Sequence, residues 1–589
     1  MFVVGQTLPP LPQQGALVVA LLAAVVAGVA FERRAGRRPV ATLRQRLLLG
    51  VPWGTLVSVG IVLVVYLFLQ GGLGAWRNPV VVPFRAWSYL APLGVVTAAF
   101  GHAGPGHLVG NLVATLAFAP LVEYAWGHFP EERGAHTFAD AASNPYVRAF
   151  LVFPAAVVGV GVATAAFALG PVIGFSGVVF AFAGFALVYY PLSTVAALVV
   201  SDGIRLAYRA LRDPLLTASG RPAFITPWWA DVAIQGHALG LLTGILLAGW
   251  LALRRGRQLP TPGRLFVGAL LVAVGQNLWA VYWFLGGGEY VLFRAVGLAL
   301  VVLLAAVVAA VGVDSGTTLS ARLQAVRTDG GSADRSGGER RLAGVDDTDS
   351  RPSFLAPVAL LVLLLAVAAM AGPATLANLT TVDDDELPGE PVEISGYSVT
   401  YAEDVQNGMV SVIDVGAFGL STDVNTSGVI VRNPDRHVWT TAVSKGRLAF
   451  AGDRRVVVGG VGWREEVRVT RRGFSAAGGP TVYRVTLTHD GERRLAHRSD
   501  PAQVEPRVAG WNVSLVATDA PADAASPFRL NLTRDNRSVS VPVPTGNESV
   551  SAGGVRFVRE NRAVFAVVGE NGTATRVRVA ARETYREAD

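Results

Sequence analysis

Long apolar runs without charge constrain this sequence more than any other feature. Several stretches of about 17 to 25 residues contain no Asp, Glu, Lys or Arg, which is the length that an α-helix needs to cross the hydrocarbon core of a bilayer. Hydrophobic residues make up 51% of the chain and charged residues only 16%, whereas a soluble domain has about 25% charged residues. We therefore expect a polytopic membrane protein.

These runs predict ten transmembrane helices. Their approximate ranges are 15–31, 47–70, 107–124, 150–169, 174–192, 193–210, 231–252, 264–285, 289–313 and 354–372. The arginine clusters that follow the first run and residue 252 are expected in the cytoplasm, because short cytoplasmic loops are enriched in Lys and Arg. With the N-terminus outside, ten spans place the C-terminus outside too. The segment 193–210 carries Arg205 and Arg209 toward its outer end, and we expect it to cross because both side chains can snorkel from one helix end.

Composition divides the chain into six segments. They are an extra N-terminal helix with a basic cytoplasmic loop at 1–46, a six-helix core at 47–252, two additional transmembrane helices at 253–313, a polar linker at 314–352, a final transmembrane helix at 353–376 and a β-rich domain at 377–589. The linker is rich in Gly, Ser, Asp and Arg and lacks periodicity, which predicts cytoplasmic disorder. Short alternating stretches in the last segment predict an exterior antiparallel β domain of the sandwich or barrel kind.

Potential glycosylation sequons agree with an exterior location for this β-rich segment. N-x-S/T occurs at Asn378, Asn425, Asn512, Asn531, Asn536, Asn547 and Asn571. Each occurrence alone is a weak signal. Their number supports the orientation that the helix count gives independently.

Composition also excludes several functions. The chain has no cysteine, so disulfides, thiolate metal sites and a cysteine nucleophile are excluded. The net charge is +7, but the arginines cluster beside apolar runs, where they act as topology signals, so we expect no nucleic-acid partner. Any covalent chemistry must use serine, threonine or a carboxylate.

The first candidate for such chemistry is Ser176, in Gly174-Phe175-Ser176-Gly177 near the expected outer end of its helix. Glycine on both sides allows another backbone to approach the hydroxyl closely. The same pattern is common where membrane helices simply pack together, so Ser176 alone does not indicate a nucleophile.

The second candidate is His237, which shares one helical face with Gly240 and Gly244 at spacings i, i+3 and i+7. His237 follows Asp231 by six residues, about 9 Å along a helix, a depth that Ser176 can share. An intramembrane histidine is either a hydrogen-bonding structural residue, a proton relay or part of a functional site.

The third candidate is a group of polar residues around Gly104-Pro105-Gly106. His107 and Asn111 are one helical turn apart and point the same way, and His102 precedes them. Paired side-chain donors of this kind can bind the oxyanion that forms when serine attacks a carbonyl. A metal pair or helix-packing residues are the alternatives, but without carboxylate or cysteine companions we expect no metal.

Taken together, these residues resemble the rhomboid family of intramembrane proteases over about 47–252. The matching positions, in order, are His102, His107, Leu108, Asn111, Glu123, Gly174, Ser176, Gly177, His237, Gly240 and Gly244. Phe180 stands where active members often have a tyrosine that stacks on the catalytic histidine. Trp76-Arg77 is similar to the Trp-Arg pair of the family's first outer loop, but lies further before His102 than expected.

The resemblance implies a serine endopeptidase that cleaves membrane-anchored proteins without a metal or an organic cofactor. It implies that Ser176 is the nucleophile and His237 its general base, with oxyanion donors His107, Asn111 and the Ser176 N–H. The remaining matched residues are expected to be structural or to support the dyad: His102, Glu123, Gly174, Gly177, Phe180, Gly240 and Gly244. The predicted partners are transmembrane substrates, the bilayer and an unknown exterior partner of the β domain, in a multi-pass cell-membrane protein.

Two other functions remain open. A catalytically silent rhomboid relative would bind client helices, but such proteins typically lose the serine or the histidine, and both are present here. A transporter would use intramembrane polar residues such as Gln276 and Asn277. No inverted hydropathy repeat supports that alternative, and these two side chains can simply join helices by hydrogen bonds.

Overall fold

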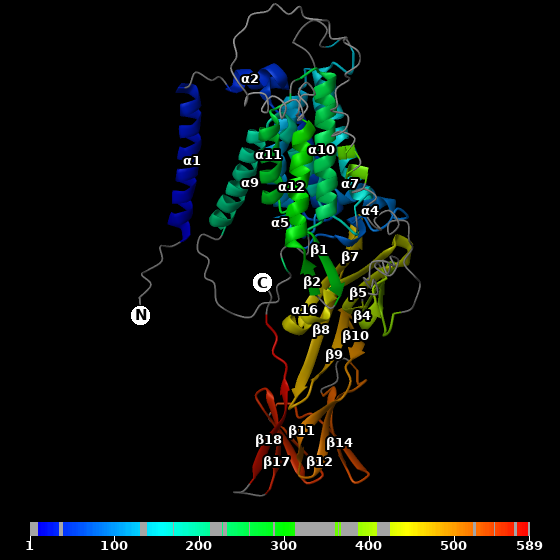
Figure 1. Ribbon diagram of the computed structural model, residues 1–589. Helices are drawn as coiled ribbons and strands as arrows, with labels where there is room; N and C mark the ends of the chain where they lie inside the picture. The colour runs from blue at the N-terminus through cyan, green and yellow to red at the C-terminus, as the bar shows by residue number, and fades with distance from the viewer. Residues whose placement is uncertain are drawn as a thin grey trace, which may run out of the picture.

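The computed structural model shows a helical bundle joined to an elongated β region (Figure 1). The described residues are 10–34, 39–129, 138, 140–168, 170–212, 227, 232–257, 259–286, 289–311, 360–362, 364–366, 387–408, 425–521, 526–546, 548–569 and 574–586. The predicted linker 314–352 lies outside these residues. Of the predicted span 354–372, only 360–362 and 364–366 are described, and both are helical.

The helical bundle comes first in the chain and the region rich in antiparallel strands follows it, which confirms the predicted fold class. The main helices are α1 (Pro10–Arg34), α2 (Pro39–Arg46), α3 (Trp53–Val64, continued to Leu69), α4 (Pro92–Ala98), α5 (Pro105–Trp126), α6 (Pro145–Val147, continued to Val152), α7 (Phe153–Ala166), α8 (Ser176–Tyr189), α9 (Pro191–Arg212), α10 (Ile234–Arg254), α11 (Pro262–Gly275) and α12 (Arg294–Val311). Helix α1 stands beside the bundle next to α9, where Gln14 Nε2 donates to Leu211 O at 2.7 Å (Figure 1).

Three helices among the described residues are long and apolar enough to cross a bilayer. They are Pro105–Trp126, Pro145–Ala166 and Ile234–Arg254. Shorter apolar helices lie at Gln14–Ala23, Trp53–Leu69, Ser176–Tyr189, Pro262–Gly275 and Arg294–Ala310. The arginine-bearing α9 is in neither group, so its crossing stays a prediction.

Helix α9 nevertheless returns the chain to the end of the bundle where α8 began. Its Arg205 Nη2 donates to Gly110 O, 3.2 Å away, in the first turns of α5.

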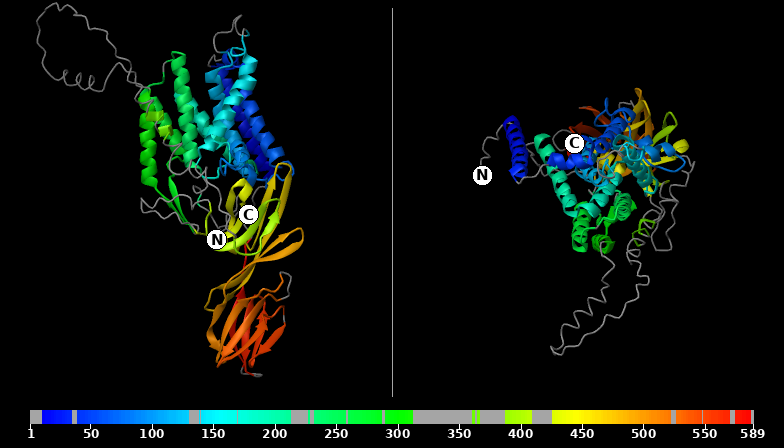
Figure 2. Two further views of the ribbon diagram at one scale, coloured as in Figure 1. Left: turned by 90° about the vertical axis from the view of Figure 1, so that its right-hand side faces the viewer. Right: turned by 90° about the horizontal axis from the view of Figure 1, so that it is seen from above.

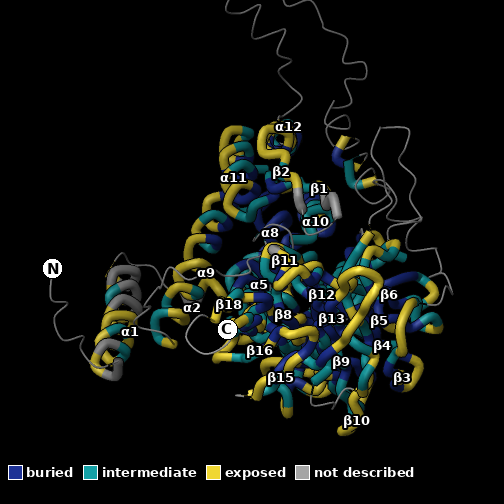
Figure 3. The backbone as a smooth tube through the Cα atoms, turned by 90° about the horizontal axis from the view of Figure 1, so that it is seen from below, coloured by how far each residue is buried: buried dark blue, intermediate teal, exposed yellow. Residues whose placement is uncertain are grey.

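Helix α8 lies at the centre of the bundle, and every residue from Val178 to Tyr189 is buried. Seen from below, the outward faces of α9, α11 and α12 are exposed, as expected for helices in contact with lipid (Figure 3).

The segment between α11 and α12 differs from the prediction of helices at 264–285 and 289–313. Helix α11 ends at Gly275, and an antiparallel pair follows, β1 (Tyr282–Gly286) with β2 (Glu289–Leu292). Asn277 has φ +58°, a left-handed conformation that does not continue a helix. The two strands are rich in aromatic residues, which favour strands, whereas apolar content alone does not distinguish a strand from a helix.

The β region contains two hydrophobic cores stacked end to end below the bundle (Figure 2). Its strands are β3 (Val392–Ile394), β4 (Tyr397–Gln406), β5 (Asn425–Asn433), β6 (Val438–Ser444), β7 (Asp453–Gly460), β8 (Trp463–Ala476), β9 (Thr481–His489), β10 (Glu492–Arg498), β11 (Ala502–Val508), β12 (Trp511–Ala517), β13 (Phe528–Arg534), β14 (Arg537–Pro542), β15 (Ser549–Ala552), β16 (Val555–Glu560), β17 (Ala563–Val568) and β18 (Thr575–Arg582). One 8-stranded sheet, containing β7–β10 and β15–β18, faces a 4-stranded sheet at each end, β3–β6 and β11–β14. The single predicted β domain at 377–589 is thus two sandwiches, because the 14-residue β8 reaches from one core into the other.

The sandwich nearer the helices contacts the loop that follows α3. Val82 packs against its core together with Trp463, and a Cβ on Gly459 would lie 2.9 Å from Val80 Cγ1. This contact fixes the β region at one end of the bundle.

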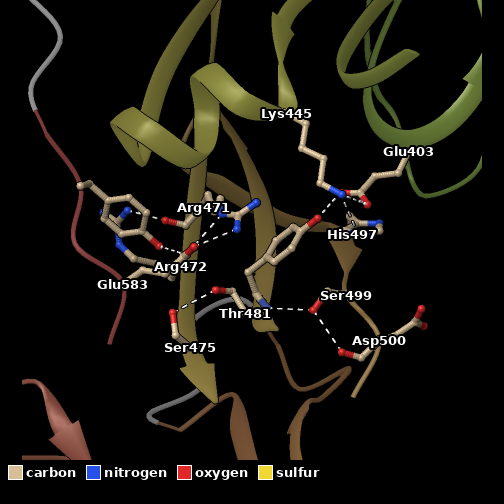
Figure 4. A network of polar contacts seen from close by, with 12 residues as sticks. Glu403, Lys445, Arg471, Arg472, Ser475, Thr481, His497, Ser499, Asp500 and Glu583 are labelled. Carbon is tan, nitrogen blue, oxygen red and sulfur yellow. Dashed lines mark hydrogen bonds and ion pairs between the residues drawn. The ribbon is translucent and has the colours of Figure 1, made fainter. Parts of the chain in front are cut away.

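A polar network joins the strands of the same sandwich (Figure 4). Glu403 accepts hydrogen bonds from Lys445 Nζ at 2.6 Å, from Tyr401 OH at 2.6 Å and from Tyr483 OH. Lys445 is the only lysine in the sequence. Burial acts to lower the Lys445 pKa, but the hydrogen bond to Glu403 contributes to a net rise above its usual value. The network ties β4 to β9 and to helix α16 (Lys445–Ala451).

Candidate active site

The candidate site forms where α8 and α10 begin. Ser176 is the first residue of α8, and His237 lies in the first turn of α10. The His237 Nε2 to Ser176 Oγ distance is 2.9 Å, which is hydrogen-bond length. The structure therefore brings together two residues that are 61 positions apart in the sequence.

Glycines bring the two helices into backbone contact. A Cβ on Gly240 would lie 2.0 Å from Gly177 O, and one on Gly244 would lie 2.0 Å from Ala181 O. Gly184 makes the reciprocal contact, because its Cβ would lie 2.2 Å from Leu241 O. Small residues allow this approach between membrane helices, and here they set the distance between serine and histidine.

Phe180 packs on the imidazole of His237. The ring centroids are 4.2 Å apart and the planes are inclined by 15°, which is a stacked arrangement. Phe180 lies one turn after Ser176 on α8, so the same helix supplies the hydroxyl and fixes the orientation of the imidazole.

The predicted oxyanion donors lie on the neighbouring α5. Helix α5 begins with Pro105, whose fixed φ suits a first helical position, and Gly127 (φ +75°) ends it. A Cβ on Gly174 would lie 2.4 Å from His107 Cε1, and Gly174 itself has φ +126°, so glycine is required here on two grounds. His107 is therefore packed against Gly174, which precedes Ser176 by two residues.

His102 orients the amide of Asn111. His102 Nδ1 is 3.1 Å from Phe100 O, which only accepts, so this nitrogen carries the proton. His102 Nε2 must then accept from Asn111 Nδ2, 3.0 Å away. An amide nitrogen has two protons, so one of them stays available for a second acceptor.

A family comparison matches this part of the chain. Residues 87–255 match the family model described as Rhomboid domain. The chain contains a rhomboid domain. The search of curated proteins and the search of solved structures found no match.

The rhomboid domain match contains every residue predicted for the site but leaves Trp76-Arg77 outside. It begins at Trp87, which is buried and donates from Nε1 to Val82 O at 2.6 Å. Trp87 is thus the better candidate for the family's loop tryptophan. Ser88 follows it in place of an arginine.

Glu123 lies at the other end of the rhomboid domain, away from the dyad. Its carboxylate accepts from the N–H groups of Gly54 and Thr55 at 2.7 and 2.8 Å and from Thr55 Oγ1 at 2.7 Å. His128 Nε2 is 2.6 Å from Glu123 Oε1, and both side chains are fully buried. Glu123 therefore caps the start of α3, a structural role.

Gln70 is a supporting residue that the sequence reading missed. It is fully buried, and its Nε2 donates to Val80 O at 2.9 Å and to His102 O at 3.0 Å. Its Oε1 accepts from the His102 N–H at 2.8 Å. The one available signal was a polar residue that ends an apolar run just before Gly71-Gly72.

A cavity of about 30 Å³ adjoins the dyad, lined by Ser176, Gly177, Gly236 and His237 among others. This volume suits one water molecule. Within the described part of the chain, His237 Nδ1 has no hydrogen-bond partner, so no acid completes a triad there. The only described cluster of metal-ligand type is Glu465, His489 and Asp490 in the β region, remote from the dyad.

Proposed function

We propose that the chain is an intramembrane serine endopeptidase that uses Ser176 and His237. The observation that carries the proposal is the 2.9 Å contact between Ser176 Oγ and His237 Nε2 inside a rhomboid domain. A serine hydroxyl is a weak nucleophile until a neighbouring base takes its proton, and a neutral imidazole is suited to that task.

The chemistry follows from this geometry. Ser176 Oγ attacks the scissile carbonyl while His237 Nε2 takes the hydroxyl proton and later gives it to the leaving amine. The Ser176 N–H lies at the N-terminus of α8, where backbone donors are unpaired and the helix dipole favours negative charge. With His107 and the spare proton of Asn111, it would stabilise the oxyanion. Water from the adjoining cavity would then hydrolyse the acyl-enzyme.

The substrates we propose are membrane-anchored proteins. Ser176 is half-buried at one end of the bundle, so a peptide bond can reach it only near the membrane surface. The β region lies at this same end and should contact the extramembrane part of a substrate. We place both on the exterior side.

A cleavage assay tests the function. Protein reconstituted in liposomes with a model single-span substrate should give discrete products, and Ser176→Ala should give none. Ser193→Ala, at an exposed serine on α9, is the matched control and should cleave normally. Substrate that co-purifies uncleaved with the wild type would favour the silent client-binding alternative.

Cysteine labelling tests the orientation, because the native chain has no cysteine background. Ser538→Cys, exposed on β14, should react with a membrane-impermeant maleimide in intact cells. Ala142→Cys, exposed near the opposite end of the bundle, should be protected until the membrane is permeabilised. The reverse pattern would show that the orientation is inverted.

A further inference from the structure

An apolar cavity lies between α5, α7, α8 and α10, away from the dyad. Its volume is about 190 Å³, and its lining includes Trp126, Phe153, Phe182, Leu247 and Trp250. Trp250 lies 13 residues beyond His237, about 20 Å along α10, and neither Ser176 nor His237 lines the cavity. An apolar protein cavity of about 150 Å³ binds a benzene-sized hydrocarbon, so this one has room for part of an acyl chain.

The cavity is accessible from the lipid side. Leu247 and Trp250 on α10 are 43% and 56% exposed, although both line it. Val152 on the facing side, directly before α7, is also exposed. A hydrocarbon chain can therefore enter from the bilayer without passing the active site.

Two arginine guanidinium groups pack over the rings of the two cavity-lining tryptophans. Arg148 Cζ is 3.9 Å from the ring centroid of Trp126, and Arg254 Cζ is 5.4 Å from that of Trp250. Arg255 Nη2 donates to Trp126 O at 2.6 Å. Positive charge thus borders the cavity at the end of the bundle where α5 and α10 finish.

This positive charge is only partly balanced. Arg46, Arg148 and Arg255 donate to carbonyls at the C-terminus of α5, which supplies about half a negative charge. No carboxylate among the described residues pairs with Arg46, Arg148, Arg254 or Arg255. Burial lowers the pKa of Arg255, and the positive charge of Arg46 lowers it further. An anion at this position would relieve the mutual repulsion of the guanidinium groups.

We propose that this site binds an anionic phospholipid, with one acyl chain in the cavity and the phosphate at Arg148, Arg254 and Arg255. Guanidinium groups pair well with phosphate oxygens, and basic pockets between transmembrane helices suit such headgroups. The bound lipid would join α5, α7 and α10. The site is separate from the proposed dyad and does not depend on it.

Native mass spectrometry of the delipidated full-length protein tests the site. The probes are phosphatidylglycerol, phosphatidylcholine with the same acyl chains, and glycerol 1-phosphate, which lacks a chain. The wild type should prefer phosphatidylglycerol, and Arg254→Gln should weaken that binding by about fivefold, the effect of one arginine near a lipid headgroup. Ala156→Phe, which fills the cavity, should weaken binding of both lipids.

Arg209→Gln is the matched control, because it removes an exposed arginine on α9 at the other end of the bundle and should leave lipid binding unchanged. Equal affinity for the two lipids in the wild type would overturn the proposal. It would also be overturned if glycerol 1-phosphate bound as tightly as the lipid, or if Arg254→Gln and Ala156→Phe both bound lipid normally. Because binding is measured directly, an inactive protease would not affect the result.

Discussion

Gly240→Ala tests whether the close contact between α8 and α10 sets the geometry of the dyad. The new Cβ would lie 2.0 Å from Gly177 O, and real Cβ atoms essentially never approach a heavy atom closer than 3.0 Å. The obstacle is backbone, which cannot rotate away as a flexible side chain can. Helix α10 must therefore shift or tilt by about 1 Å relative to α8, and such overpacking costs about 1–3 kcal/mol.

The shift acts directly on the proposed proton transfer. Ser176 Oγ and His237 Nε2 are 2.9 Å apart, and a movement of about 1 Å takes them beyond hydrogen-bond range. A misplacement of about 1 Å can cost about 100-fold in rate. We expect Gly240→Ala to lower kcat by about that factor while most of the protein stays folded.

The assay is the initial rate of substrate cleavage in liposomes, normalised to the folded fraction from thermal unfolding. Gly249→Ala is the control on the same helix, because a Cβ there meets no atom within 4 Å. It should cleave at the wild-type rate. A wild-type rate for Gly240→Ala would refute the claim that the glycine contact positions the dyad.

Three further changes test other parts of the structure. Gln70→Leu removes the hydrogen bonds that hold the His102 backbone, so kcat should fall by on the order of tenfold with KM unchanged. This loss is smaller than the 10² to 10³ expected for a lost oxyanion donor. A normal kcat would argue against this positioning role. Glu123→Ala leaves buried donors and His128 without a partner, which should cost about 3–5 kcal/mol in denaturant unfolding; an unchanged midpoint would show that the α3 cap is dispensable. Burial lowers the pKa of His497 from 6.5, although the charge of Glu403 opposes the shift. The unfolded chain therefore binds more protons than the folded protein below about pH 6.5, and the free energy of unfolding should decrease as the pH falls below that value. His497→Gln should flatten that decline in thermal midpoint, and an unaltered slope would contradict it.

The sequence predicted the fold class and the family because both are indicated by short stretches of sequence that can be recognised without knowing their neighbours in space. Charge-free runs indicate membrane helices whatever their neighbours are, and the predicted site residues, from His102 to Gly244, all lie within the matched rhomboid domain. The roles of Ser176 and His237 stay predictions until activity is measured. The structure adds the geometry on which the proposal depends.

Features that depend on contacts between distant parts of the sequence were not predictable in the same way. Gln70 belongs to no motif, and its role becomes visible only when the following loop brings Val80 and His102 beside it. The β1–β2 pair lies within apolar sequence that also suits a helix. Similarly, alternation along β8 indicates a strand but not that one strand serves two cores.

Covalent labelling tests the central claim most directly. Protein in liposomes is treated with a fluorophosphonate, digested and mapped by mass spectrometry. The proposed dyad predicts one adduct, on Ser176, that is lost in Ser176→Ala and strongly reduced in His237→Ala. An adduct on another serine, or wild-type labelling of Ser176 in His237→Ala, would contradict a mechanism in which His237 activates Ser176.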